Sequence, residues 1–164
     1  MRIGLISDTH DLLRPEARKF LEGCDHIIHA GDIANAATLD AVARIAPLTV
    51  VRGNNDRGDW ADSLPHSAVV SFDEVKVLVI HDLTELKIDL EELDAQVLVC
   101  GHSHKPGVER RQGVLVVNPG SAGRRRFKLP VALGELHVQG ARVSARIVEL
   151  DIPIATKPSP RKLR

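Results

Sequence analysis

The sequence is poor in aromatic residues, with no tyrosine, one tryptophan and three phenylalanines. Proteins that bind single-stranded nucleic acids stack bases on aromatic side chains and follow the backbone with basic ones. The formal charge is zero, with 22 basic and 22 acidic side chains, so no global positive field attracts nucleic acid or anionic lipid. A nucleic-acid partner is therefore not expected.

Cysteines and long hydrophobic runs are also scarce. The two cysteines, Cys24 and Cys100, cannot form a disulfide framework, and we expect both to be small buried apolar residues. No apolar run reaches the ~18 residues that span a bilayer, and residues 1–11 place carboxylates where a signal peptide needs apolar residues. These absences predict a cytoplasmic protein that does not associate with membranes.

The length of 164 residues suits one domain with its own hydrophobic core. We expect this domain to cover residues 1–154, with no internal repeat and no linker. Residues 155–164 combine Pro, Ser and basic residues without apolar periodicity, and we expect them to form a flexible basic tail.

Short runs rich in Val, Ile and Leu predict strands that are covered on both faces. They span residues 2–7, 25–30, 48–53, 75–80 and 95–100. Helical segments at residues 15–23 and 35–46 separate the first three strands and favour a parallel arrangement with crossovers. Later runs, at residues 113–118, 131–138 and 141–150, alternate more. The last two are joined by Gln139 and Gly140, a pair typical of a hairpin, so a β-rich half follows an α/β half.

Metal-ligand residue types follow all five strands of the first group. They are Asp8 and His10, then Asp32, then Asn54 with Asn55 and Asp56, then His81 with Asp82, and finally His102 with His104. Oxygen and nitrogen donors of this kind suit divalent metals of the borderline class. Sites in open α/β sheets assemble at the carboxyl ends of the strands. Each motif alone is weak, but recurrence at the same end of five strands indicates a metal centre.

The spacing of these residues adds a geometric expectation. In an extended segment residues i and i+2 point the same way, so Asp8 with His10, and His102 with His104, should each project as a pair into one pocket. A glycine precedes the ligand segment after the second, third and fifth strands, where it allows a sharp turn and a close backbone approach. His29, inside the second strand, is expected to be a core residue, or else a hydrogen-bond donor near the centre.

The ordered motifs SDTH, AGD, RGNND, IHD and GHSH resemble those of the calcineurin-like metallophosphoesterase superfamily. Together with NPGS at residues 118–121, they are most similar to its small YfcE-type phosphodiesterase group. The resemblance implies an α/β fold, namely a four-layer α/β/β/α sandwich in which two mixed sheets face each other and helices lie outside.

The resemblance also implies a site for two divalent ions. One ion would be held by Asp8, His10, Asp32 and His104, and the other by Asp32, Asn54, His81 and His102. Asp32 would bridge the ions, because two nearby cations need a shared anionic ligand. A hydroxide that bridges the ions would attack phosphorus in line with the leaving oxygen. Mn²⁺ is the first expectation, with Ni²⁺, Fe²⁺, Co²⁺ and Zn²⁺ as alternatives for the same donors.

Two positions depart from the superfamily pattern. Asn55 stands where a histidine is usual, and an amide cannot transfer a proton at neutral pH. We expect Asn55 to contact the substrate, with slow turnover or a preference for good leaving groups. Asp82 replaces a common glycine, and would either orient His81 or a neighbour, or cap the next segment. Ser121 and Arg124, which follow the NPG sequence, are expected to contact the phosphate.

These observations predict a metal-dependent phosphoesterase, in the first place a phosphodiesterase that acts on a small diester or nucleotide. Two alternatives stay open: a non-catalytic protein-interaction scaffold of the same fold, like a retromer subunit, and a nuclease. The scaffold is disfavoured because that subunit has lost part of its metal set, whereas every ligand position is filled here. Zero net charge and few aromatic residues disfavour the nuclease. Relatives suggest a homodimer or a homotetramer.

Overall fold

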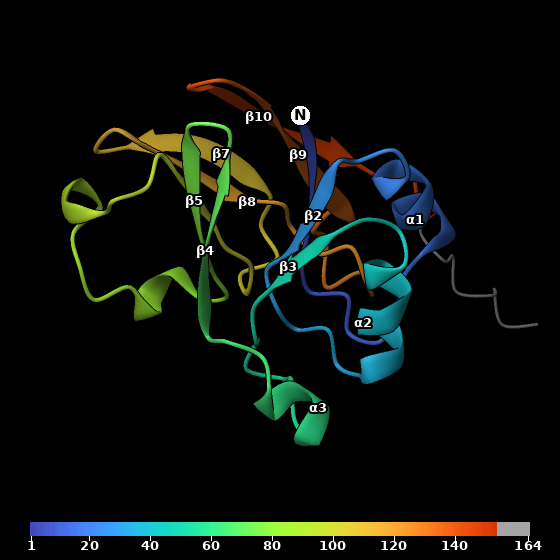
Figure 1. The fold of residues 1–164 in the computed structure, drawn as a ribbon. Coiled ribbons are helices and arrows are strands. Elements are labelled where there is room, and N and C mark those ends of the chain that lie inside the picture. Colours follow the sequence, from blue (N-terminus) through green and yellow to red (C-terminus); the bar gives the residue numbers. More distant parts are fainter. Residues whose placement is uncertain (154–164) are drawn as a thin grey trace, which may run out of the picture.

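The structure is a computed structural model that describes residues 1–153. The basic tail predicted at residues 155–164 lies outside the described residues. Two five-stranded sheets face each other across the main hydrophobic core (Figure 1). Each sheet combines parallel and antiparallel strands, as the predicted fold requires.

The first sheet has the strand order β10-β9-β1-β2-β3. Its strands are β1 (Arg2–Ile6), β2 (His26–His29), β3 (Leu48–Val50), β9 (Ala132–Gln139) and β10 (Arg142–Glu149). β1, β2 and β3 run parallel and are joined through α1 (Pro15–Leu21) and α2 (Ala36–Ala43). β9 and β10 form the predicted hairpin, although Gln139 pairs with Arg142 and the turn therefore lies one residue further along.

The second sheet has the strand order β4-β5-β6-β8-β7. Its strands are β4 (Ser67–Phe72), β5 (Val75–Ile80), β6 (Val97–Val99), β7 (Gly107–Arg111) and β8 (Val114–Asn118). β5, β6 and β8 are parallel, and the antiparallel strands β4 and β7 form the edges. The sequence patterns predict the three central strands but neither edge strand.

Helical segments cover the two outer faces unequally. α1 and α2 pack on the first sheet over a cluster that includes Leu21, Ile27 and Val42. The outer face of the second sheet is covered by a segment with two short 3₁₀ helices, η1 (Leu83–Glu85) and η2 (Leu90–Glu92). The four-layer α/β/β/α prediction is confirmed, with a fourth layer of 3₁₀ turns. A further short helix, α3 (Asp59–Asp62), follows β3.

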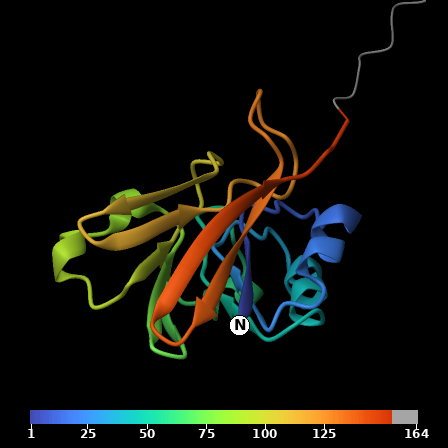
Figure 2. The same cartoon turned by 90° about the horizontal axis from the view of Figure 1, so that it is seen from above.

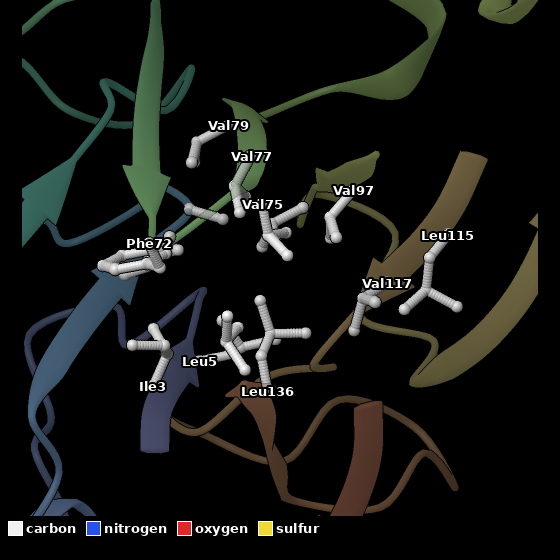
Figure 3. Close-up of a cluster of buried hydrophobic side chains, with 14 of the residues drawn as sticks. Ile3, Leu5, Phe72, Val75, Val77, Val79, Val97, Leu115, Val117 and Leu136 are labelled. Atoms are coloured by element: carbon white, nitrogen blue, oxygen red, sulfur yellow. The ribbon is translucent and has the colours of Figure 1, made fainter. Parts of the chain in front are cut away.

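Alternation along the central strands builds the layers. Ile3 and Leu5 of β1 point into the core between the sheets, whereas Ile6 packs beneath the helices. Val77 and Val79 approach the same core from β5 of the second sheet (Figure 3). Seen from above, α1 and α2 lie on one side of the first sheet and the green and yellow strands of the second sheet lie on the other (Figure 2).

The structure also bears on membrane-spanning helices and on the two cysteines. Within residues 1–153, no helix is long and apolar enough to cross a membrane. Cys24 and Cys100 are buried free thiols, as predicted. Burial raises the pKa of Cys100 to about 12, so this thiol is unreactive at neutral pH.

Candidate metal centre

The residues that follow β1, β2, β3, β5 and β6 meet at the carboxyl ends of these strands. Two groups of side chains place their metal-binding atoms within 4.8 Å of one another: Asp8 with His10 and His104, and Asp8 with Asp32 and His81. Each group draws on segments that are distant in the sequence. The carboxyl ends of parallel strands from both sheets therefore supply one centre.

Asp8 is fully buried, and its two carboxylate oxygens have different surroundings. Oδ2 accepts hydrogen bonds from the Ser7 hydroxyl at 2.7 Å and from the His102 N–H at 3.1 Å. Oδ1 accepts no hydrogen bond from any residue between 1 and 153, and the Nε2 atom of His104 lies 3.1 Å from it. A buried carboxylate oxygen without a donor is costly, and a cation is the partner that would satisfy it.

His10 completes the first group. Its Nε2 atom lies 3.8 Å from Asp8 Oδ1, 3.7 Å from Asp32 Oδ2 and 3.4 Å from His104 Nε2. Burial lowers the pKa of His10, and the nearby carboxylates of Asp32 and Asp8 oppose this effect only in part. The lowered pKa favours the neutral imidazole, which is the form that binds metal ions.

Asp32 belongs to the second group and also faces His10 of the first. Its Oδ1 atom accepts the backbone N–H of Asn55 at 2.8 Å, and its Oδ2 atom accepts the side-chain amide of Asn55 at 2.6 Å. Oδ2 faces His10, whereas Oδ1 lies 3.5 Å from the Nε2 atom of His81. Burial alone would raise the pKa of Asp32, but the hydrogen bonds from His81 and Asn55 hold it well below its usual range. Asp32 is thus an anion with one oxygen toward each group.

His81 connects the second group to the sheet. Its Nδ1 atom donates to the Ala30 carbonyl at 2.7 Å, which leaves Nε2 to face the centre. The Oδ1 atom of Asn54 lies 3.0 Å from His81 Nε2 and 3.0 Å from His102 Nδ1. Burial alone would lower the pKa of His81, but its hydrogen bond to the Asp32 carboxylate raises the pKa to about 9. In the absence of a metal ion, His81 is therefore an imidazolium at neutral pH.

Five of the seven predicted ligands have left-handed backbones. Their φ values are 53° at Asp8, 43° at His10, 56° at Asp32, 64° at His102 and 58° at His104. The expectation that these segments are extended is therefore wrong, and the turns send His102 toward Asn54 and His104 toward Asp8. Asp8 and His10 nevertheless lie in one group, as expected. Left-handed non-glycine residues cost about 1 to 3 kcal/mol each, and such strain is concentrated at functional sites.

Two glycines allow these turns to pack together. A Cβ atom on Gly31, where φ is 94°, would lie 2.7 Å from His81 Nδ1 and 2.8 Å from the backbone nitrogen of Gly53. A Cβ atom on Gly101 would overlap the Ser7 hydroxyl and would lie 2.8 Å from Asp8 Oδ2. Only glycine permits this close approach, as the sequence indicates.

Asp56 joins the loops that carry Asp32 and Asn54. Its carboxylate is buried and accepts four backbone N–H groups, those of Asp32 at 3.0 Å, Ile33 at 2.7 Å, Ala34 at 2.8 Å and Gly53 at 2.8 Å. The sequence places Asp56 among the metal-ligand residue types after the third strand and does not predict this role for it. The sequence feature that points to this role is the carboxylate at the end of the GNND motif.

His29 is fully buried beneath the centre. Its Nδ1 atom accepts the Gly31 N–H at 3.1 Å, so Nε2 carries the proton and donates to the Thr9 hydroxyl at 3.1 Å. Burial lowers the pKa of His29 to about 4, so the ring is neutral at physiological pH. Both alternatives for this residue hold: His29 is a buried core residue, and it donates a hydrogen bond to Thr9, which lies between Asp8 and His10.

Ser121 and Asp82 contact residues of the centre, whereas Arg124 lies on the surface. Ser121 is buried and its hydroxyl donates to the Asp8 carbonyl at 2.9 Å, while Arg124 is exposed and pairs with Asp11. Both alternatives for Asp82 hold. One of its oxygens accepts the Thr84 N–H at 2.9 Å and caps η1, and the other lies 3.5 Å from His102 Nε2.

Two clefts share Asp82 in their linings, and His102 lines one while His81 lines the other. The first has a volume of about 460 Å³; its lining includes His102, the buried side chains Cys100 and Val116, and the rim residues Lys105 and Gly107. The second has about 410 Å³ and is lined by Asn54, His81, Arg52, Arg57 and His66 among others. A larger hollow of about 620 Å³ lies beside Met1 and His137, and none of the predicted ligands lines it.

Two facing mixed sheets, helical outer layers and a cluster of carboxylates and imidazoles at the strand ends define the metallophosphoesterase class of fold. Residues 1–140 match the calcineurin-like phosphoesterase superfamily domain. The chain belongs to this superfamily, as its motifs predict. Members of the superfamily use divalent metal ions, and the two side-chain groups are candidate ligands for them.

Curated relatives agree with this membership. A probable metallophosphoesterase of Methanothermobacter thermautotrophicus is 31% identical over 166 residues, which cover 94% of this chain and 95% of the relative. A phosphodiesterase of Methanocaldococcus jannaschii is 28% identical over 139 residues, which cover 73% of this chain and 83% of the relative.

Solved structures share the fold at lower identity. An archaeal phosphodiesterase superposes with a TM-score of 0.76 at 23% identity, covering 90% of this chain and 100% of its own. Vps29 of Chaetomium thermophilum superposes with a TM-score of 0.75 at 23% identity, covering 90% of this chain and 97% of its own.

Proposed function

We propose that the protein is a metal-dependent phosphodiesterase that acts on a small diester or nucleotide. The observation that carries this proposal is the cluster of facing donors at the strand ends, in which Asp8 and Asp32 lie among three imidazoles. Membership in the phosphoesterase superfamily supports hydrolysis of a phosphoric ester. The relative from M. jannaschii, which is named a phosphodiesterase, supports a diester as the substrate.

We assign the seven predicted ligands to two divalent ions. Asp8, His10, Asp32 and His104 would hold the first, and Asp32, Asn54, His81 and His102 would hold the second. The donor set fits cations, because Asp8 Oδ1 is buried without a donor among the described residues. Asp32 is assigned as the bridge, since one of its oxygens faces each group. Mn²⁺, or alternatively Ni²⁺, Fe²⁺, Co²⁺ or Zn²⁺, would supply an activated water and positive charge for the phosphoryl oxygens.

The remaining residues of the centre position these donors. The Ala30 carbonyl holds the Nδ1 proton of His81, so the other ring nitrogen is free for an ion once the ring is neutral. Asn55 gives two hydrogen bonds to Asp32 and fixes the orientation of that carboxylate. Because its amide cannot protonate a leaving group, we expect substrates whose leaving groups depart as stable anions to be preferred.

The two clefts support a diester over a monoester. A phosphodiester carries two organic substituents, and two clefts of about 460 and 410 Å³ adjoin the centre, one lined by His102 and the other by His81. We propose that one substituent occupies each cleft while the phosphorus lies between them. The first cleft, with Cys100 and Val116 in its lining, suits an apolar or aromatic group, whereas Arg52 and Arg57 make the second more polar.

Hydrolysis of two chromogenic esters tests the proposal. Chelator-stripped protein is given bis-p-nitrophenyl phosphate or p-nitrophenyl phosphate, with and without Mn²⁺. We expect cleavage that depends on Mn²⁺ and favours the diester. Faster cleavage of the monoester would contradict the diester assignment. The assay is repeated with Ni²⁺, Fe²⁺, Co²⁺ and Zn²⁺, and no cleavage with any of these ions or with Mn²⁺ would contradict the enzyme assignment.

A second candidate function is a non-catalytic protein scaffold. The observation that favours it is the fold shared with Vps29, one structure of which contains a bound cyclic peptide. The same preparation separates the two functions, because a non-catalytic scaffold would cleave neither ester with any divalent metal, whereas a phosphodiesterase would cleave the diester.

A further inference from the structure

Three consecutive arginines, Arg124 to Arg126, occupy the loop between β8 and β9, and the structure separates their contacts. Arg124 pairs with Asp11 at 3.0 Å on the surface. Arg125 donates to the Ile152 carbonyl at 3.0 Å. Arg126 alone of the three turns toward the metal ligands, and its contact is with His10.

The contact of Arg126 is made by its guanidinium. The Nη2 atom lies 3.4 Å from the Nε2 atom of His10, which is the ring nitrogen that faces Asp8 and Asp32. An imidazole nitrogen that binds an ion has no lone pair left for a hydrogen bond. With the first ion in place, the Arg126 donor would lose this acceptor and lie free beside the centre.

The loop is fixed to the segment that carries Asp8 and His10. The Ala122 N–H donates to the Ser7 carbonyl at 3.1 Å, and Arg14 donates to the Gly123 carbonyl at 3.0 Å. Gly123 packs so closely on the Thr9 carbonyl that a Cβ atom there would overlap it. The start of the arginine run is therefore held at a fixed distance from the centre.

A tight turn then sets the direction of the loop. The Leu129 N–H donates to the Arg126 carbonyl at 3.1 Å, and Phe127 within this turn has a left-handed φ of 53°. The turn leaves the Phe127 ring 94% exposed and outside the core. Arg126 is thus the last residue of the loop before the chain turns away from the metal ligands.

We propose that Arg126 binds a phosphoryl oxygen of the substrate beside the ion held by His10, an inference that rests on the proposed phosphodiesterase function. A guanidinium is charged at all working pH values, and its planar donors match phosphate oxygens. Asn55 brings no positive charge to the position where the superfamily usually has a histidine, and its amide is already bound to Asp32. Arg126 supplies a cation beside His10 instead.

The test compares Arg126→Ala and Arg126→Lys with Lys128→Ala, which removes the same charge from an exposed position in the same loop. Three quantities are measured for each protein: the Mn²⁺ content, hydrolysis of bis-p-nitrophenyl phosphate, and binding of inorganic phosphate to the Mn²⁺-loaded protein by calorimetry. Arg126→Ala should keep its Mn²⁺ content, lose about 100-fold in kcat and bind phosphate about tenfold more weakly. Arg126→Lys should recover part of the phosphate binding, and Lys128→Ala should resemble the wild type.

The outcomes separate this inference from the proposed function. If the wild type hydrolyses the diester and Arg126→Ala matches Lys128→Ala in rate and in phosphate binding, the inference is overturned and the function stands. If the wild type hydrolyses no ester but binds phosphate, and Arg126→Ala loses that binding, the function fails and the anion site stands. If the wild type does neither, both fail.

Discussion

Replacement of Asp56 by Asn tests whether one buried carboxylate holds the loops of the metal centre together. The side chain of Asp56 is 1% exposed. Oδ1 accepts the N–H groups of Ile33 and Ala34, and Oδ2 accepts those of Asp32 and Gly53. An asparagine has one oxygen only, so in either orientation its NH₂ group would face two backbone N–H groups.

The cost follows from those two donors. A buried backbone N–H that loses its acceptor costs about 1 to 3 kcal/mol, so two cost about 2 to 6 kcal/mol. The two remaining hydrogen bonds also weaken, because a neutral amide oxygen replaces a charged one. Since domains are stable by about 5 to 15 kcal/mol in total, Asp56→Asn should remove a large share of the free energy of unfolding.

Urea unfolding of chelator-stripped protein measures this difference. The matched control is Asp94→Asn, because Asp94 is 90% exposed and its ion pair with Lys76 lies on the surface. Surface ion pairs contribute about 1 kcal/mol or less, so the control should unfold almost like the wild type. If Asp56→Asn shifts the free energy of unfolding no more than Asp94→Asn does, the four hydrogen bonds do not support the loops as described.

Three further changes test the ligands, the buried histidine and the first cleft. Asp32→Ala should abolish Mn²⁺-dependent hydrolysis and leave at most one ion per chain by metal analysis; unchanged activity would contradict the bridging assignment. The pKa of His29 is lowered from 6.5 to about 4, because burial favours the neutral ring in the folded protein. In chelator-stripped protein the contribution of His29 to stability is therefore complete above pH 6.5. As the pH falls toward 4 this contribution is lost, and the free energy of unfolding decreases by about 3 kcal/mol in all. Asparagine does not titrate, so in His29→Asn the free energy of unfolding should decrease between pH 6.5 and 4 less steeply than in the wild type, by about 1.4 kcal/mol per pH unit. A pH profile parallel to that of the wild type would contradict a buried neutral His29. A Cβ atom on Gly107 meets nothing within 4 Å, so Gly107→Leu should fit and fill part of the 460 Å³ cleft. This substitution should raise KM for the diester about tenfold. An unchanged KM would exclude this cleft as a site for a substituent of the substrate.

Burial decides which strands the sequence reveals. β1, β5, β6 and β8 are covered on both faces, so their apolar runs stand out in the sequence. β7 has five exposed residues and is a strand only because its backbone pairs with β8. β4 alternates between exposed and half-buried positions at the other edge of the same sheet. Edge strands of this kind leave little hydrophobic signal.

The ligand types at the strand ends are visible in the sequence, whereas the turns that carry them are not. The order of the motifs places Asp8, Asp32 and His81 after three different strands, and the topology brings them together. The left-handed φ values of His102 and His104 are set by tertiary packing, so residue spacing predicts the wrong direction for this pair. Asp56 acts through backbone contacts about 23 residues away, a distance at which local patterns carry no information.

The proton on His81 links the metal-free centre to metal binding. The Asp8 and Asp32 carboxylates are both buried, and the imidazolium of His81 offsets part of their charge when no ion is present. Its pKa is raised to about 9, so below that pH an ion must displace this proton before it can bind the Nε2 atom. The affinity for Mn²⁺ should therefore rise by about tenfold per pH unit between pH 7 and 8 through His81 alone.

Calorimetric titration with Mn²⁺ at both pH values, in buffers of different ionisation enthalpy, counts the released protons. A value of about one proton from His81 is expected at pH 7.5, because the imidazole of His10 has a lowered pKa and is largely neutral before the ion binds. Binding that releases no proton and does not change with pH would mean that the ion leaves the His81 to Asp32 contact intact. In that case His81 is not a ligand, and the charge of the two buried carboxylates must be offset by the ion and this imidazolium together.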